Sequence, residues 1–217
     1  WLKGVVMKAH YNGLIPRNPF IQFHISPNVK EREYLTEDEL KAVMTHEFAD
    51  SKLAYIRDIF IFASFTALSF VDIQELTNDN IVEVNGEKWI LSKRHKTKVA
   101  FQVKLLDIPL QIVERYRPMQ KDNRIFPGLN YWSICKPLKR MIRECGITKS
   151  ISFHCSRHGF ATLALSKGMP IESVSRVLGH TNIVTTQLYA KITTQKLGND
   201  LTAFGNQLNR TFGNIKV

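Results

Sequence analysis

Between residues 153 and 189 the sequence alternates short helical patterns with glycine and proline. Apolar residues recur at three- and four-residue steps over 153–167, which is the spacing of one helix face. Gly168 can end this first helix, and Pro170 fits the first turn of a second helix over 171–178. The segment therefore predicts two consecutive helices joined at a sharp break.

The chain beyond the second helix predicts a turn and a third, shorter helix. Gly179 ends the second helix and presents His180 at the turn. Thr181 or Asn182 can then cap a short helix that holds Tyr189. Two helix termini are thus expected to bring a histidine and a tyrosine toward the first helix.

One edge of the first helix is polar and carries His154 and Arg157. Residues three apart lie on the same helix face, so these two side chains can bind one ligand. If the three helices pack together, His180 and Tyr189 approach the same face. The pattern therefore outlines a site of four side chains.

The charge balance indicates a partner of opposite charge. The 217-residue chain has 30 Lys and Arg against 19 Asp and Glu, a net charge of +11 and an isoelectric point near 9.7. Such an excess favours a polyanion, because Lys and Arg that neutralise phosphates release condensed counterions. Charge alone does not exclude a basic protein that has no polyanion partner, but we expect that the partner of this protein is nucleic acid.

The order of the predicted elements is helices, a small sheet and helices again, which is an α+β class that is mainly helical. Thr36 and Glu39 form a capping box at the start of the main domain, and the helix that follows it is apolar nearly all round, as in the centre of a core. An Asn-Gly turn and alternating residues predict a three-stranded antiparallel sheet. The expected ranges are helices at 52–68, 108–119 and 132–144 and strands at 81–84, 88–91 and 100–105.

The cysteines and the apolar stretches indicate in which cellular compartment the protein works. Cys135, Cys145 and Cys155 are an odd number without a Cys-x-x-Cys pair, which indicates free thiols in a reducing compartment. The longest apolar stretch, 59–70, is interrupted by polar residues and is too short to span a membrane. We therefore expect a cytoplasmic, nucleoid-associated protein.

The sequence predicts neither a metal nor a nucleotide cofactor. His154, Cys155, His158 and His180 have a spacing that fits none of the common zinc frameworks. A glycine-rich phosphate loop and the nucleophile elbow of a serine hydrolase are both missing from the sequence.

An ordered set of motifs carries a family resemblance. His154-x-x-Arg157 is followed by Leu178-Gly179-His180 and by Tyr189, nine residues after that histidine, and a basic segment at 93–98 lies upstream. Each motif is weak alone, but in this order the chain resembles the tyrosine recombinases, or phage-integrase family. The resemblance covers about residues 34–195 and implies the catalytic-domain fold of that family.

The resemblance implies a role for each residue of the four-residue site. Tyr189 would be the nucleophile that attacks a DNA phosphodiester. Arg157 and His154 would hold the scissile phosphate, and His180 would donate a hydrogen bond to it. Arginine's planar fork suits two phosphate oxygens at once, and fixed cationic donors stabilise phosphoryl transfer without a metal.

The same resemblance implies roles on the hairpin and behind the site. Lys96 would protonate the leaving 5′-hydroxyl, and Asp72 would brace the site from behind. Lys93, Lys98 and Arg94 on the same basic segment are candidate DNA contacts.

One position departs from the family pattern. Ser69, in the string Thr66-Ala-Leu-Ser-Phe-Val-Asp72, stands where the family has its first catalytic arginine. Serine has no charge and cannot replace a bidentate clamp. We hypothesise that Arg94, two residues before Lys96, fills the role, because the sequence resembles some integrases of conjugative transposons that lack the same arginine and remain active. Two alternatives stay open: an enzyme that has lost activity, or an Arg94 that only contacts the phosphate backbone.

The resemblance implies site-specific cutting and rejoining of DNA, without metal or ATP, for integration and excision of a mobile element. Residues 1–26 would be the remnant of a core-binding domain with a linker, and 27–217 the catalytic domain with its tail, so we expect a piece of a longer chain. Leu197, Leu201 and Phe204 would dock the tail on a neighbouring protomer of a tetramer, or pack in cis. Two alternatives remain, a strand-passing type IB topoisomerase and a DNA-binding accessory protein without catalysis.

Overall fold

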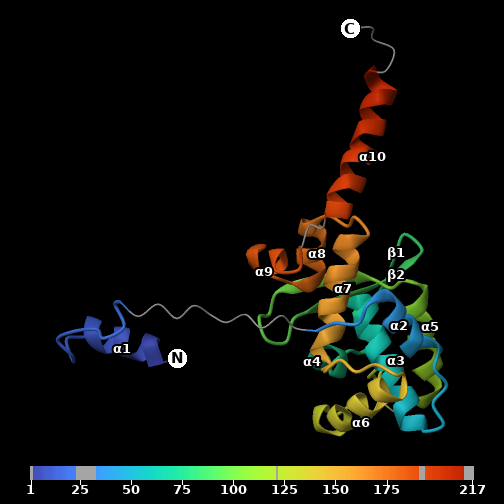
Figure 1. Cartoon of the computed structure of the whole chain (residues 1–217). Helices are drawn as coiled ribbons and strands as arrows, with labels where there is room; N and C mark the ends of the chain where they lie inside the picture. Colours follow the sequence, from blue (N-terminus) through green and yellow to red (C-terminus); the bar gives the residue numbers. More distant parts are fainter. Residues whose placement is uncertain (1, 23–32, 121, 191–193, 213–217) are drawn as a thin grey trace. The chain divides into compact units, whose positions relative to one another are not determined.

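The computed structural model describes residues 2–22, 33–120, 122–190 and 194–212 (Figure 1). The chain forms two compact units, Trp1–Glu31 and Arg32–Val217, and the first contains the helix α1 (Leu2–Tyr11). The expected domain boundary after residue 26 lies outside the described residues. The division into a core-binding remnant and a catalytic domain stays a prediction.

The second unit is mainly helical and has one three-stranded sheet, which confirms the predicted class. Among its described residues, none of the helices is both long and apolar enough to cross a membrane. In chain order its elements are α2 (Glu37–Thr45), α3 (Ser51–Thr66), α4 (Phe70–Gln74), η1 (Asn78–Asn80), β1 (Ile81–Val84), β2 (Glu87–Lys93), β3 (Ala100–Lys104), α5 (Asp107–Tyr116), η2 (Arg117–Met119), α6 (Tyr131–Glu144), α7 (His154–Ser166), α8 (Ile171–Leu178), α9 (Val184–Gln187) and α10 (Thr194–Phe212).

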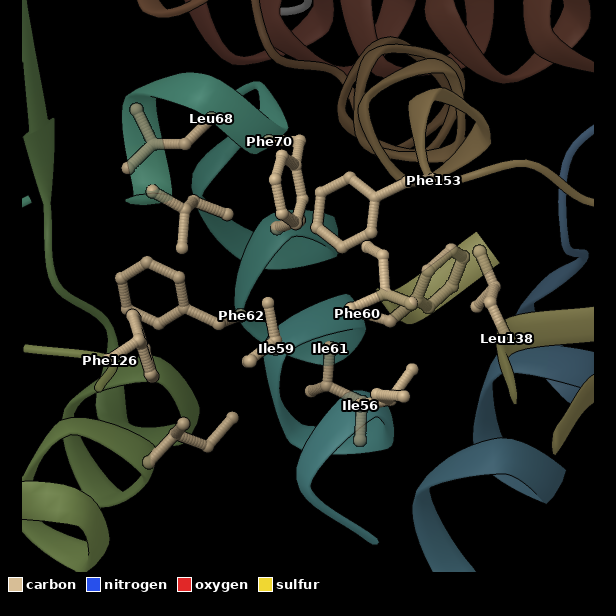
Figure 2. Close-up of a cluster of buried hydrophobic side chains, with 14 of the residues drawn as sticks. Ile56, Ile59, Phe60, Ile61, Phe62, Leu68, Phe70, Phe126, Leu138 and Phe153 are labelled. Atoms are coloured by element: carbon tan, nitrogen blue, oxygen red, sulfur yellow. The ribbon is translucent and has the colours of Figure 1, made fainter. Parts of the chain in front are cut away.

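Helix α3 is the centre of the core, as its apolar surface predicted. Asp50 caps its first turn by accepting a hydrogen bond from the Lys52 backbone N–H. Phe60 and Phe62 are buried on different sides of the helix, among side chains from several other elements (Figure 2). Helices α5, α6 and α7 all pack against α3. The helix ends at Thr66, two residues before the predicted end, because Ala67 adopts a left-handed conformation.

The sheet has the order β1-β2-β3 with both pairs antiparallel, as predicted. Asn85 and Gly86 both have positive φ, as a tight two-residue hairpin turn requires. In β3 the buried Phe101 and Val103 alternate with exposed residues. Strand β3 also contacts α8, so the end of the basic β2–β3 turn lies close to the segment that carries the histidines.

The helices of 153–189 form as predicted, with two differences. Gly179 ends α8 in the left-handed conformation, and Asn182 accepts a hydrogen bond from the first N–H of α9. Helix α9 stops at Gln187, however, so Tyr189 lies in the turn after it rather than within a helix. Pro170 is the N-cap of α8 and not its first residue.

A second, smaller core joins the end of α3 to α7 and α8. Its buried members are Ala67, Ala161, Leu165, Val174 and Leu178. Tyr189 packs against this cluster from its partly buried position. Burial of apolar surface stabilises a protein by about 25 cal/mol per Å². This burial therefore holds the turn that carries Tyr189 against the helices.

Candidate active site

The N-terminus of α4 forms the acidic corner of the candidate site. Ser69 is the N-cap of this helix, and its hydroxyl donates to Oδ2 of Asp72 over 2.7 Å. Asp72 is 8% exposed, and its Oδ1 accepts from the His95 backbone N–H over 2.9 Å. Burial acts to raise the pKa of Asp72, but hydrogen bonds from His95, Arg94 and Ser69 outweigh it and leave the pKa below its ordinary value.

Arg94 comes from the β2–β3 turn and is buried beside that corner. Its Nη1 donates to Oδ2 of Asp72 over 2.8 Å, so the serine and the arginine share one carboxylate oxygen. Its Nη2 donates to the backbone carbonyl of Val177 in the last turn of α8, and its guanidinium lies 4.0 Å from the centre of the Phe101 ring. The side chain is thus held on three sides. Burial lowers the pKa of Arg94, and the Asp72 carboxylate opposes that shift.

Gly179 has a close contact with the same arginine. A Cβ added at this glycine would lie 2.9 Å from Nε and 3.0 Å from Cγ of Arg94. Its φ of +62° independently favours glycine. This position therefore needs glycine for two separate reasons, and the chain can bring α8 onto Arg94 only because Gly179 has no side chain.

Arg157 on α7 is buried next to Arg94. Its Nη1 donates to the Ala67 carbonyl over 2.8 Å, and its Nη2 donates to the Leu178 carbonyl. Both carbonyls lie at helix C-termini, where backbone oxygens lack a partner within the helix. Burial, and then repulsion from Arg94, lower the pKa of Arg157 to about 10, while Tyr189 and Asp72 act in the opposite direction. The guanidinium therefore stays charged at neutral pH.

Four aromatic rings line up from α7 to the tyrosine-bearing turn. The ring centres of His154 and His158 are 4.9 Å apart, and those of His158 and Tyr189 are also 4.9 Å apart. The His180 ring lies nearly parallel to Tyr189 with 6.4 Å between centres. His154 is exposed, whereas the other three are partly buried. The predicted approach of His154, His180 and Tyr189 to one another is thus observed.

His180 is bound through one ring nitrogen. Its Nδ1 lies 2.8 Å from the hydroxyl of Thr186, a residue that is fully buried. Burial, and then the nearby charges of Arg157, Arg94 and His154, lower the pKa of His180 to about 4. The imidazole is therefore neutral at physiological pH and carries one N–H.

The three lysines of the β2–β3 turn are all exposed. Lys93 ends β2, and Lys98 has a positive φ of 57° and donates its backbone N–H to the Arg94 carbonyl. Lys96 lies at the tip, and it makes no hydrogen bond or ion pair with another described residue. The structure thus brings Arg94, but not Lys96, into contact with the rest of the candidate site.

The arrangement suits a phosphate ester. The Arg157 guanidinium and the neutral His180 imidazole act close to the Tyr189 phenol, and the Arg94 charge acts on both Arg157 and His180. Fixed donors of this kind stabilise charge on phosphoryl oxygens. Within the described part of the chain, no three His, Cys, Asp or Glu side chains gather as metal ligands.

Sequence reasoning missed two of these contacts. It did not single out Thr186, although a polar residue three positions before Tyr189 is one helical turn away and can face the same side. It took Gly179 only as a helix stop, because the approach of Arg94 joins residues 85 positions apart (179 − 94). It left open whether His158 orients its helix, bonds a neighbour or touches the site, and the ring lies between His154 and Tyr189.

The family model of the phage integrase family matches residues 33–196 of this chain. Tyrosine recombinase XerA of Pyrococcus horikoshii is 32% identical over 177 residues, which are 75% of this chain and 58% of XerA. Tyrosine recombinase XerD of Listeria innocua is 26% identical over 204 residues, 86% of this chain and 67% of XerD. The chain thus spans only about three fifths to two thirds of these relatives' length.

Solved structures show the same fold. The Tn1549 transposon integrase in complex with a circular intermediate DNA has a TM-score of 0.78 at 18% identity, covering 93% of this chain and 76% of that one. The XerH site-specific recombinase bound to a palindromic difH substrate has a TM-score of 0.67 at 22% identity, covering 84% and 56%. With a family model that covers most of its length, this chain belongs to the phage integrase family.

Proposed function

We propose that this chain is the catalytic part of a site-specific DNA recombinase, an integrase that cuts and rejoins strands for integration and excision of a mobile element. The observation that carries the proposal is that Tyr189, in the turn after α9, lies beside His158 of α7 and His180 after α8, and interacts with the charge of Arg157, also on α7. Membership of the phage integrase family supports it. So do the relatives named tyrosine recombinases and the similar integrase solved with DNA.

In this proposal the Tyr189 phenol oxygen attacks a backbone phosphorus, and the bond to the 5′-oxygen breaks. A 3′-phosphotyrosyl link forms, with Arg157 and His154 on the phosphate oxygens and His180 donating to one of them. A phenol, with an ordinary pKa of about 10, is a better leaving group than a sugar alcohol. The 5′-hydroxyl of another strand can therefore reverse the step without ATP.

Arg94 takes the place of the missing family arginine at Ser69. Support comes from the oxygen of Asp72 that both residues share, which puts the guanidinium beside the serine. Its charge acts on both Arg157 and His180, so it contributes to the same electrostatic field. Ser69 keeps a structural task as the cap of α4.

Lys96 protonates the leaving 5′-oxygen in this scheme. Its exposed place two residues after Arg94 leaves the amine able to reach a bound strand. Lys93 and Lys98 on the same exposed turn contact the phosphate backbone and position the duplex rather than read its sequence.

The covalent intermediate is the direct test. Nicked suicide duplexes that tile the ends of the genetic element carrying this gene would be incubated with the protein, and adducts resolved on a denaturing gel. The wild-type chain should form a covalent adduct, and Tyr189→Phe should form none while binding DNA equally. Arg94→Ala should reduce the adduct by about 100-fold or more, the order of loss for one donor to a developing charge. Arg143→Ala, an exposed arginine on α6, serves as the charge-matched control.

The other candidate functions give different results. An accessory DNA-binding protein, which Ser69 favours, would bind the duplexes and form no adduct at all. A type IB topoisomerase would form the adduct and relax supercoils but exchange no strands between two duplexes. Near-normal cleavage by Arg94→Ala would refute the compensating role of that arginine alone.

Assembly into a tetramer on DNA through α10 is a further part of the proposal. Leu197, Leu201, Phe204 and Leu208 recur at helical spacing on α10 and are 40–60% exposed. Docking in trans predicts that the Leu201→Asp, Phe204→Asp double variant lowers the mass of the DNA complex in light scattering. Packing in cis predicts a lower melting temperature with unchanged mass. Asn206→Asp, on the same helix, is the control.

A further inference from the structure

Thr186 is an unusual residue within its segment. It is 0% exposed, whereas residues 181–185 and 187–188 around it are all exposed. Its hydroxyl lies 2.8 Å from Nδ1 of His180. Its backbone carbonyl accepts the N–H of Tyr189 over 3.0 Å. One buried residue thus contacts both the imidazole and the turn that carries the tyrosine.

The direction of the hydroxyl bond follows from what else is near. Among the described residues, the Thr186 hydroxyl has no hydrogen-bond partner other than His180. A buried hydroxyl proton without an acceptor costs free energy, so the hydroxyl donates to Nδ1. A neutral imidazole has one N–H, and with Nδ1 as acceptor that hydrogen lies on Nε2. His180 is neutral at physiological pH, as its lowered pKa shows.

We propose that Thr186 is a positioning residue that holds His180 as an Nε2–H donor and ties that donor to the docking of the Tyr189 turn. His180 follows directly after α8, whereas Thr186 belongs to α9, so the bond links two elements rather than two atoms of one turn. If the tyrosine-bearing turn leaves, the imidazole loses the partner that fixes its tautomer. The proposal rests on the proposed function, in which the Nε2–H meets a phosphate oxygen.

The first test reads the tautomer and needs no catalysis. Nitrogen NMR of the full chain labelled with 15N-histidine should show His180 with its proton on Nε2, and the signal should change in Thr186→Val, which keeps the shape and removes the hydroxyl. Thr186→Ser should restore the wild-type signal. A proton on Nδ1 in the wild-type protein would overturn the proposal whether or not the protein cleaves DNA.

The second test asks whether the hydroxyl acts through His180. Thr186→Val should slow adduct formation on the suicide duplex by about tenfold, the effect of one hydrogen bond in the transition state, with DNA affinity unchanged. Thr186→Ser should recover most of the rate, and Thr185→Val, at the exposed neighbouring position, should match wild type. In a His180→Ala background, Thr186→Val should have no further effect.

Several results would contradict this positioning role. An equal rate for Thr186→Val and Thr185→Val would do so, as would the same tenfold loss in the His180→Ala background, which would indicate a purely structural threonine. Urea unfolding of each variant separates loss of fold from loss of positioning, and Thr186→Ser still tests the hydroxyl if the valine variant unfolds. A wild-type chain that forms no adduct, yet shows the Nε2 proton, would refute the proposed function alone.

Discussion

Replacing Gly179 with alanine should destabilise the protein more than a glycine-to-alanine change at an ordinary helix end. The added methyl would lie 2.9 Å from Nε of Arg94, closer than real Cβ contacts come. Arg94 cannot simply swing away, because Asp72 and the Val177 carbonyl hold its guanidinium. Either α8 or the arginine must therefore move.

Two contributions set the size of the effect. The left-handed conformation at φ +62° costs an alanine about 1–2 kcal/mol. Forcing one more carbon into a packed contact costs about 1–3 kcal/mol more. The free energy of unfolding should fall by roughly 2–5 kcal/mol, or roughly 5–15 °C in melting temperature for a unit of this size.

Urea unfolding with a matched control separates the two contributions. Gly146 also follows a helix and has φ +74°, but a Cβ there meets nothing within 4 Å, so Gly146→Ala should cost only the backbone part. In an Arg94→Ala background, the destabilisation caused by Gly179→Ala should likewise fall to about 1–2 kcal/mol. Equal destabilisation by Gly179→Ala and Gly146→Ala in the wild-type background would refute the close packing of Arg94 on this glycine.

Three further outcomes follow from the same contacts. Asp72→Ala should lower the free energy of unfolding, measured in urea, by about 3–5 kcal/mol, because it leaves the buried Arg94 guanidinium without its carboxylate. Glu75→Ala breaks only the exposed pair with His95 and should lower it by at most about 1 kcal/mol. The pKa of His180 is about 4 in the folded state and 6.5 ordinarily, so the unfolded state binds more protons between these pH values. The free energy of unfolding should therefore fall as the pH drops from 6.5 to 4. Urea unfolding curves of His180→Gln should show a smaller fall over the same pH range. Lys93→Ala or Lys98→Ala should each reduce the slope of log affinity for DNA against log salt by about 0.9, measured by fluorescence anisotropy, and an unchanged slope would argue against a phosphate contact.

Local patterns predicted most of the fold. The capping box at Thr36, the Asn85-Gly86 turn and the apolar surface of α3 all depend on neighbouring residues, and all appear where they were expected. The end of α9 was harder to place, because Tyr189 could extend a short helix equally well by sequence. Packing against the second core, which joins distant segments, holds it in a turn instead.

The sequence predicted which residues belong to the site better than it predicted the contacts between them. The motif spacing indicated that Arg157, His180 and Tyr189 meet, because it reflects helices whose ends converge. The place of Arg94 depended on a hypothesis about Ser69, and the shared Asp72 oxygen now gives that hypothesis a geometric basis. Thr186 had no motif of its own, since its importance lies in a single side-chain bond formed only after folding.

Two arginines bind neighbouring carbonyls at the carboxyl end of α8. Arg94 donates to the Val177 carbonyl and Arg157 to the Leu178 carbonyl. Like charges so close repel, and part of the folding free energy is spent on keeping them together. In the proposed function, a phosphate that bridges the pair would remove this repulsion, and the protein would bind the phosphate more strongly for that reason. Multivalent buffer anions such as sulfate should in consequence compete with DNA more strongly than chloride does at equal ionic strength.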